Sequence, residues 1–291
     1  MEVEGALAEI FAAFDKNGKL DEDKTGQYLK FLSGNGTSGL FVGGIAAETM
    51  SFSQDERKRW LDMVIKKKDK DLAVIFQIQY FGNYDVLEQI KYAEEAGADI
   101  LSFSQPYPAP LSAGETLEYL GFLCGQTSLP VMIYNEPAVG KAIDVNTLDG
   151  LIKRCRNIKY YKDSTHNMID LHTIMMQNKN LNVLAGSDGL IFDIMNAGGK
   201  GVVSLVINAF PELVAQAVKA IGSGDLKSGL KLQEKIMQIR AILKAGGLTA
   251  GYRYAMGLRG IDIGEPQRPY SRVGDEAKKY IKTELKNIGV L

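Results

Sequence analysis

The sequence predicts an α/β protein folded as a (β/α)8 TIM barrel with a C-terminal helical appendage, and three observations support this prediction. Eight short apolar runs alternate with longer helical patterns along the chain. Successive runs begin roughly 20 to 33 residues apart, about the length of one strand, one helix and two short loops. The length of 291 residues suits one such barrel with additional helices. The count of eight favours a closed barrel, and an open doubly wound sheet is the alternative.

The predicted strands are the eight apolar runs, at residues 6–11, 39–43, 72–78, 99–103, 130–135, 157–162, 181–186 and 201–206. The run at 72–78 is continuously apolar, as expected for a parallel strand that is covered on both faces. Apolar residues then recur every three or four positions from Val86 to Ala96, which predicts a helix with one apolar face. Gly97 suits the end of this helix, because glycine readily adopts the left-handed conformation found there.

The last barrel unit and the appendage follow from similar patterns. After the eighth run, Asn208 can cap a helix and Pro211 suits its first turn. No strand pattern follows, and two or three helices are expected, the last of which starts at Asp275. We therefore expect a barrel over residues 1–223 and a helical appendage over residues 224–291 that packs on it within a single structural unit.

Composition excludes several classes of protein. The chain has 34 basic and 35 acidic residues, so no basic surplus points to nucleic acid or to an anionic membrane. The apolar runs are far shorter than the roughly 20 residues of a membrane-spanning helix, and the N-terminus lacks the basic segment of a signal peptide. The two cysteines, Cys124 and Cys155, do not make a disulfide framework, which favours a cytoplasmic location. His166 and His172 lie six residues apart and do not share a helix face, so no metal site is expected.

Candidate catalytic residues lie where strands of such a barrel end, because the active site of this fold is at the C-terminal ends of its strands. Lys162 ends the sixth run and Tyr134 is near the end of the fifth. A lysine among apolar walls loses its charge more easily, and its free amine can then attack a carbonyl carbon. A neighbouring tyrosine could relay the protons that imine chemistry moves. The alternative is a lysine that reaches from the strand end to solvent and a tyrosine that only packs.

Three segments resemble one known family. PVMIYNEPA (130–138), NIKYYKDST (157–165) and the segment 185–213 are similar to the dihydrodipicolinate synthase / N-acetylneuraminate lyase family of class I pyruvate-dependent aldolases, and the likeness covers nearly the whole chain. The resemblance implies a (β/α)8 barrel with a C-terminal helical appendage, usually assembled as a homotetramer, so a homotetramer or a dimer is expected here. It also implies a lyase that makes or breaks a carbon–carbon bond at a pyruvate enamine.

The same resemblance implies roles for individual residues. Lys162 matches the lysine that forms the Schiff base, so no cofactor beyond this covalent imine is expected, and Tyr134 matches the proton-relay tyrosine. The backbone carbonyl of Val203 would face the lysine and Gly186 would line the floor of the pocket. Tyr107 matches a tyrosine that some members pass across a subunit contact.

The loop after the second strand departs from the family. It usually reads Gly-Thr-Thr-Gly-Glu or Gly-Ser-Thr-Gly-Glu, whereas here Ile45 and Ala46 replace the two hydroxyl residues and Glu48 is retained. Both hydroxyls that would hold the pyruvate carboxylate are missing, and each lost bond to a charged group costs roughly 1.5–3 kcal/mol. Val139 stands where dihydrodipicolinate synthases carry an arginine for the second substrate, and with the following GKAID it makes the chain more similar to 2-keto-3-deoxygluconate aldolases.

These observations predict a Schiff-base lyase that acts on a 2-oxo acid such as pyruvate. The 2-oxo acid and an aldehyde together would form a 2-keto-3-deoxy sugar acid, which the enzyme makes or cleaves. The residues expected to bind substrate are Ile45, Ala46, Glu48, Tyr107, Val139, Gly186 and Val203. Three alternatives stay open. The first alternative is a dihydrodipicolinate synthase that uses pyruvate and aspartate semialdehyde. The second is an imine enzyme with a less anionic donor, and the third is a non-catalytic binding protein on the same scaffold.

Overall fold

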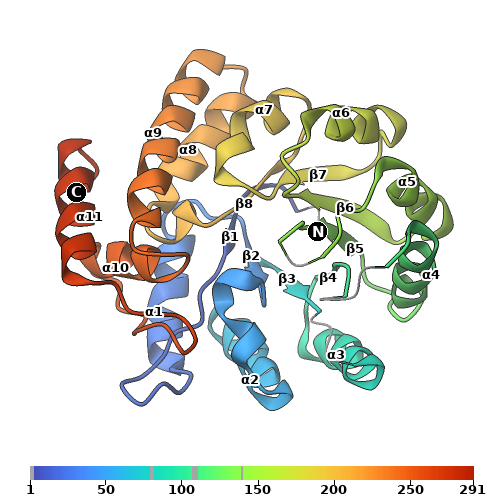
Figure 1. Cartoon of the computed structure of the whole chain (residues 1–291), viewed down its shortest axis with the longest axis horizontal. Coiled ribbons are helices and arrows are strands. Elements are labelled where there is room, and N and C mark those ends of the chain that lie inside the picture. Colours follow the sequence, from blue (N-terminus) through green and yellow to red (C-terminus); the bar gives the residue numbers. More distant parts are fainter. Residues whose placement is uncertain (1–2, 79–81, 107–110, 139) are drawn as a thin grey trace.

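The computed structural model describes residues 3–78, 82–106, 111–138 and 140–291 and shows a closed barrel of eight parallel strands in the order β1 to β8 (Figure 1). The predicted (β/α)8 barrel is therefore confirmed, and the open sheet is excluded. Each strand lies within two residues of its predicted boundaries: β1 Gly5–Glu9, β2 Gly39–Val42, β3 Ala73–Gln77, β4 Ile100–Phe103, β5 Val131–Asn135, β6 Ile158–Asp163, β7 Asn182–Ala185 and β8 Gly201–Ser204.

Helices surround the barrel and continue beyond it. Those that follow the strands are α1 Glu22–Ser33, α2 Gln54–Lys67, α3 Asn83–Ala96, α4 Ala113–Cys124, α5 Val145–Arg154, α6 Met168–Gln177, α7 Ile191–Asn196 and α8 Pro211–Gly222. The appendage consists of α9 Leu226–Lys244, α10 Ala250–Leu258 and α11 Asp275–Asn287. Four short 3-10 turns, η1 Ile45–Ala47, η2 Thr49–Ser51, η3 Asp188–Leu190 and η4 Val206–Asn208, lie in the loops after β2, β7 and β8. Gly97 ends α3 in the left-handed conformation, as the sequence predicts.

Several helices begin at a polar side chain that accepts bonds from the free N–H groups of the first turn. These N-cap residues are Asp21, Ser53, Ser112, Asp144 and Asn167. The predicted cap at Asn208 is wrong, although Pro211 does open α8. The Asn208 amide instead donates to the backbone oxygens of Glu9 and Leu205, so it fastens the loop after β8 to the end of β1.

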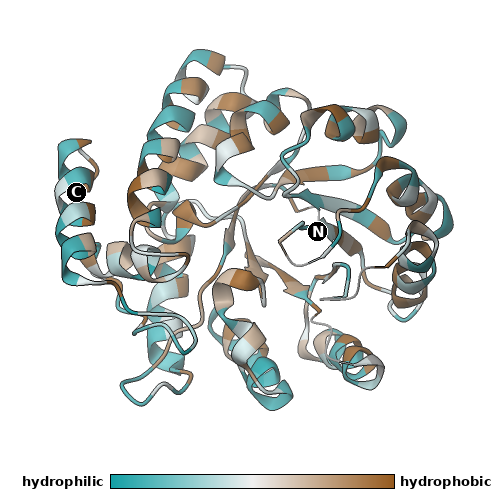
Figure 2. Ribbon diagram, viewed as in Figure 1, coloured by the Kyte–Doolittle hydropathy of each residue, from teal (hydrophilic) through white to brown (hydrophobic). Residues whose placement is uncertain are grey.

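The core has two layers, as expected for strands covered on both faces. One layer fills the inside of the barrel with side chains that include Leu7, Phe41, Ile75, Met132, Tyr134, Tyr160, Leu184 and Val203. The larger layer lies between the strands and the surrounding helices. Figure 2 shows the consequence, with hydrophobic strands in the centre and mixed faces on the outer helices.

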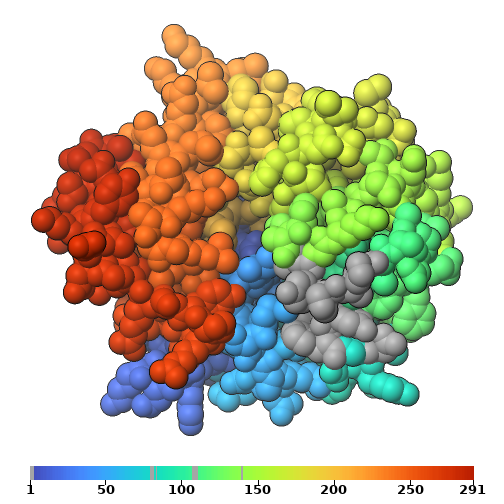
Figure 3. Space-filling model, viewed as in Figure 1, coloured from blue at the N-terminus to red at the C-terminus, as the bar shows by residue number. Residues whose placement is uncertain are grey.

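The appendage packs on one side of the barrel. Helix α9 contacts α8, α7 and η3, while α10 and α11 contact α9 and each other. The side chains of Ile236, Ile239, Leu243, Ile281 and Leu285 are almost fully buried by this packing. Figure 3 shows α9 to α11 as a continuous mass along that side. Among the described residues, no helix is long and apolar enough to span a membrane.

Candidate active site

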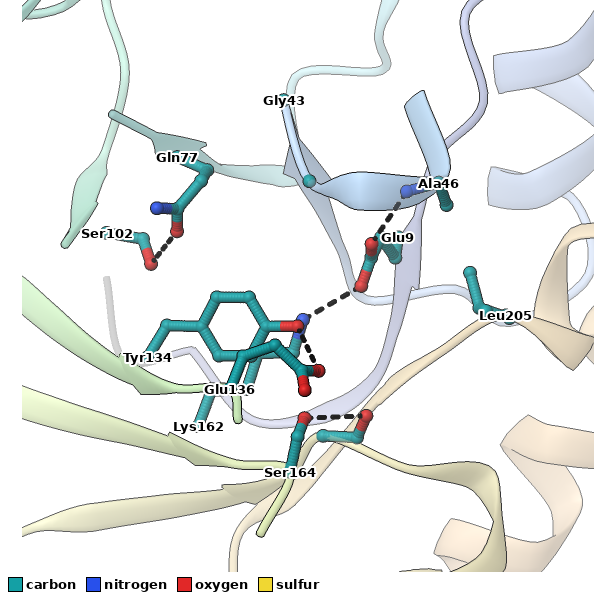
Figure 4. A network of polar contacts seen from close by, with 12 residues as sticks. Glu9, Gly43, Ala46, Gln77, Ser102, Tyr134, Glu136, Lys162, Ser164 and Leu205 are labelled. Atoms are coloured by element: carbon teal, nitrogen blue, oxygen red, sulfur yellow. Dashed lines mark hydrogen bonds and ion pairs between the residues drawn. The ribbon is translucent and has the colours of Figure 1, made fainter. Parts of the chain in front are cut away.

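Lys162 lies inside the barrel beside Tyr134. The two residues are register partners on the adjacent strands β6 and β5, which places their side chains on the same face. Lys162 is 0 % exposed and Tyr134 is 4 % exposed. The Lys162 amine lies 3.8 Å from the centre of the Tyr134 ring and 4.0 Å from that of Phe41 (Figure 4). The barrel thus holds this amine away from bulk solvent and next to a phenol.

A carboxylate also contacts the amine. Glu9, the last residue of β1, places its Oε2 atom 2.8 Å from Lys162 Nζ, and the other oxygen accepts a bond of 3.1 Å from the backbone N–H of Ala46. Glu9 is only 5 % exposed. The sequence predicts apolar walls around Lys162, and it does not single out Glu9. The available signal was a glutamate within the otherwise apolar first run.

The ion pair changes the chemistry expected of Lys162. The Glu9 carboxylate lies 2.8 Å from the nitrogen and forms an ion pair with the ammonium form of the amine. An ammonium group has no lone pair with which to attack a carbonyl. Glu9 is placed to accept the proton that the nitrogen must lose.

Tyr134 is held in its protonated form. Its hydroxyl donates a 3.0 Å bond to Glu136 Oε2. Burial, followed by the negative charges of Glu9 and Glu136, raises the pKa of Tyr134 well above its usual value of 10. Ser164 acts in the opposite direction through a hydrogen bond. At neutral pH the phenol therefore keeps its proton.

The loop after β2 is shaped around the Glu9 carboxylate. Gly44 has an ordinary negative φ, so its backbone conformation does not demand glycine. A Cβ atom at this position would lie 2.5 Å from Glu9 Oε1 and 2.9 Å from a ring carbon of Phe41. Ile45 and Ala46 follow in η1, and Ala46 is buried. Gly44 thus makes room for the carboxylate to reach the Ala46 N–H.

Glu48 faces the appendage. It is fully buried and adopts a left-handed conformation with φ of 63°, which is uncommon outside glycine. Its carboxylate pairs with the Arg253 guanidinium at 3.0 Å and accepts a 2.7 Å bond from the N–H of Gln267. The structure therefore places Glu48, predicted to bind substrate, in contacts that join the β2 loop to α10 and the following segment.

The remaining predicted residues fall into two groups. Val203 lies in the inner layer of the barrel with Tyr134, and Gly186 follows β7 next to Ser164, whose hydroxyl donates to the Gly186 oxygen at 3.2 Å. A Cβ atom on Gly186 would lie 2.2 Å from Ser164 Oγ, so this close approach requires glycine. Tyr107 and Val139 lie outside the described residues.

A second polar group, which the sequence does not single out, lies near the ends of β3 and β4. Ser102 donates a 2.6 Å bond to Gln77 Oε1, and Gln77 Nε2 donates to Ser104 Oγ at 3.1 Å. Figure 4 shows Gln77 and Ser102 on the side of Tyr134 that is opposite Ser164. Amide and hydroxyl groups of this kind can bind the hydroxyl groups of a substrate. In the described part of the chain, no three His, Cys, Asp or Glu residues gather as a metal site would require.

Comparison with known proteins gives the family. The family model described as the dihydrodipicolinate synthetase family matches residues 2–288. An uncharacterised DapA-like lyase of Halobacterium salinarum is 27% identical over 288 residues, which cover 99% of this chain and 94% of that protein. A 4-hydroxy-tetrahydrodipicolinate synthase of Methanococcus maripaludis is 26% identical over 99% of this chain and 100% of its own length. A solved dihydrodipicolinate synthase structure has a TM-score of 0.93 at 25% identity and covers 99% of this chain and 100% of that chain. The chain therefore belongs to the dihydrodipicolinate synthetase family, whose members are class I aldolase-type lyases.

Proposed function

We propose that this lyase works through a Schiff base on Lys162, and that it makes or breaks a carbon–carbon bond next to the resulting imine. The observation that supports the proposal most directly is the buried amine of Lys162, in contact with both the Glu9 carboxylate and the Tyr134 ring. The amine supplies the nucleophile, and the two neighbours supply the proton transfers that imine formation needs.

The chemistry follows from these contacts. Glu9 takes a proton from the Lys162 ammonium, and the freed lone pair attacks the carbonyl carbon of the donor. Tyr134 carries a proton from the nitrogen to the former carbonyl oxygen, which gives a neutral carbinolamine. Glu9 returns its proton to that hydroxyl, water leaves, and an iminium remains. Glu9, ionised again, takes a proton from the carbon next to the iminium, which gives an enamine. The enamine adds to an aldehyde, and the new alkoxide takes the proton back from Glu9. Addition of water to the regenerated iminium releases the product and frees Lys162. The reverse sequence cleaves the same bond.

Three observations bear on the identity of the donor and the acceptor. The sequence favours a 2-oxo acid such as pyruvate within a 2-keto-3-deoxy sugar acid, whereas the name of the Methanococcus maripaludis relative supports the dihydrodipicolinate synthase alternative with aspartate semialdehyde. The Glu9–Lys162 contact favours a third possibility, a donor that is less anionic. Assembly as a homotetramer and operation without a cofactor also remain predictions from the family resemblance.

Reductive trapping tests the imine itself. The protein is incubated with borohydride and a panel of donors that contains pyruvate, pyruvamide, acetaldehyde and hydroxyacetone, and the modified residue is identified by peptide mass spectrometry. We expect one adduct, located at Lys162 and lost in Lys162→Ala. Lys159 provides a matched control, because it lies on the same strand but is exposed. Lys159→Ala should keep the adduct.

Two results would contradict the proposal. One is the absence of an adduct at Lys162 with every donor, which would favour the non-catalytic alternative. The other is labelling that depends only on the solvent exposure of the lysine, so that Lys159 is modified as readily as Lys162.

A further inference from the structure

We propose that Glu9 determines the class of donor. Its carboxylate occupies the place beside Lys162 that the carboxylate of a 2-oxo acid would need, so the site takes a neutral aldehyde or ketone in preference to a 2-oxo acid. This inference rests on the proposed imine at Lys162.

The first argument is geometric. In the imine of a 2-oxo acid, the donor carboxylate is bonded to the carbon that is itself bonded to Lys162 Nζ. Ordinary bond lengths then place a carboxylate oxygen about 3 Å from Nζ. Glu9 Oε2 already lies 2.8 Å from the same nitrogen. A donor carboxylate would therefore have to share the immediate surroundings of the nitrogen with a second carboxylate.

The second argument concerns the hydrogen-bond donors of the loop after β2. The Ala46 N–H already donates to Glu9 Oε1, and the side chains of Ile45 and Ala46 carry no hydroxyl. The next hydroxyl along this loop, on Thr49, donates to the backbone oxygen of Gly43 at 3.0 Å. Two of the groups that could bind an incoming anion at this loop, the Ala46 N–H and the Thr49 hydroxyl, are thus engaged with the protein itself.

The third argument is electrostatic. Glu9 forms an ion pair with Lys162. Glu136 contacts the Tyr134 hydroxyl and has no ion pair within the described residues. The three charged groups sum to −1 when all are ionised. Two like charges about 4 Å apart at a partly screened site disfavour each other by about a thousand-fold in affinity. A neutral donor does not meet this repulsion.

The carboxylate is also held in place rather than free to swing away. Both of its oxygens are hydrogen-bonded, one to Lys162 and one to Ala46. Gly44 lies against it so closely that a Cβ atom there would be 2.5 Å from Oε1. Because Glu9 touches the reacting nitrogen, it acts as a catalytic group as well as a selective one. A neutral donor leaves it in position to accept and return the proton of Lys162.

Pyruvate and pyruvamide form a matched pair for the test, because they have nearly the same shape and differ by one charge. Their apparent dissociation constants are measured by borohydride trapping at Lys162 in the wild type, Glu9→Ala and Glu9→Gln. In the wild type we expect pyruvamide to bind about a hundred- to a thousand-fold more tightly than pyruvate. Both variants should reduce this ratio at least ten-fold. Glu9→Gln keeps the side-chain volume and serves if Glu9→Ala loses its fold by thermal melting.

Glu136→Gln is the matched control. It removes one negative charge near Tyr134 without touching the Lys162 ion pair, so it should change the ratio less than either Glu9 variant. Tighter binding of pyruvate than of pyruvamide in the wild type would overturn the inference, as would an unchanged ratio in both Glu9 variants. Either result leaves the imine intact. No adduct with any donor would overturn the imine, and this inference with it.

Discussion

At the end of β6, the ammonium group of Lys162 and the carboxylate of Glu9 meet 2.8 Å apart with almost no solvent around them. Removing two charges from water costs several kcal/mol per ion, which the attraction between them offsets only when the geometry is good and further hydrogen bonds are made. A buried pair of this kind is weak evidence for stability. Its position at the C-terminal end of a barrel strand, with Tyr134 beside it, favours a catalytic explanation.

The Tyr134 hydroxyl gives a test of the proton relay. Tyr134→Phe should lower the rate of imine formation by roughly a hundred-fold or more, because it removes the proton carrier and leaves the Lys162 amine in place.

The pKa of Tyr134 is raised well above 10, so the phenol of the wild type stays protonated up to at least that pH. The wild-type rate should therefore show no loss from phenol ionisation between pH 7 and about 10, measured by stopped-flow or quenched trapping. A Tyr134→Phe variant that forms the imine as fast as the wild type would exclude the proton relay.

The loop elements show how the barrel and the appendage share one site. Arg253 on α10 bonds to Glu48 in the loop after β2 and also donates to the backbone oxygens of Ala12 and Ile263. The same β2 loop presents the Ala46 N–H to Glu9. The appendage thus contacts, through Arg253, the same loop that binds the Glu9 carboxylate.

Arg253→Ala should strongly destabilise the fold. It leaves the carboxylate of Glu48 buried without its cation, a change that costs about 3–5 kcal/mol. Denaturant unfolding followed by circular dichroism measures the loss, and the double variant Arg253→Met with Glu48→Gln should recover part of it. Arg259→Ala is the comparison, because its pair with Glu212 is partly exposed and such pairs contribute about 1 kcal/mol or less. If Arg253→Ala and Arg259→Ala lower the free energy of unfolding equally, the buried pair stabilises the fold no more than the partly exposed pair does.

At the scale of the whole molecule, eight strands close the barrel and helices α9 to α11 cover one side of it (Figure 1). The apolar side chains of α9 pack on α7 and α8, so the outer surface of the barrel is not complete without them. This packing supports the prediction that residues 1–223 and 224–291 form a single structural unit.

Truncation tests that prediction. A chain ending at residue 223 would expose the apolar surfaces of α7 and α8 that α9 covers, and it would lose the partner of Glu48. We expect it to lose cooperative thermal unfolding and to bind a hydrophobic dye, whereas the full chain unfolds in one transition. A truncated chain that melts cooperatively and still forms the borohydride adduct at Lys162 would show instead that the barrel folds on its own.

Local patterns in the sequence predicted most of the architecture. The apolar runs gave each strand within two residues, because burial on both faces leaves a continuous apolar signature that does not depend on distant contacts. The prediction that Lys162 and Tyr134 share one site came from their places near the ends of two such runs and from the family resemblance, and the structure places the two residues side by side. Asn208 was misassigned because an asparagine just before a helix can cap that helix or, as here, bond to the backbone of a distant strand end, and the local sequence does not distinguish the two.

The sequence by itself thus determined the barrel, its helical appendage and the two residues at the centre of the candidate site. Only the tertiary structure decided what surrounds them. Glu9 and Lys162 are separated by 153 positions and Glu48 and Arg253 by 205, and no periodic pattern connects residues so far apart. Closure of the barrel brings the first strand to the lysine of the sixth, and return of the appendage brings an arginine to the loop after the second. Periodicity reports which face of an element is buried, whereas the partner of a buried charge is set by the way the elements close on one another.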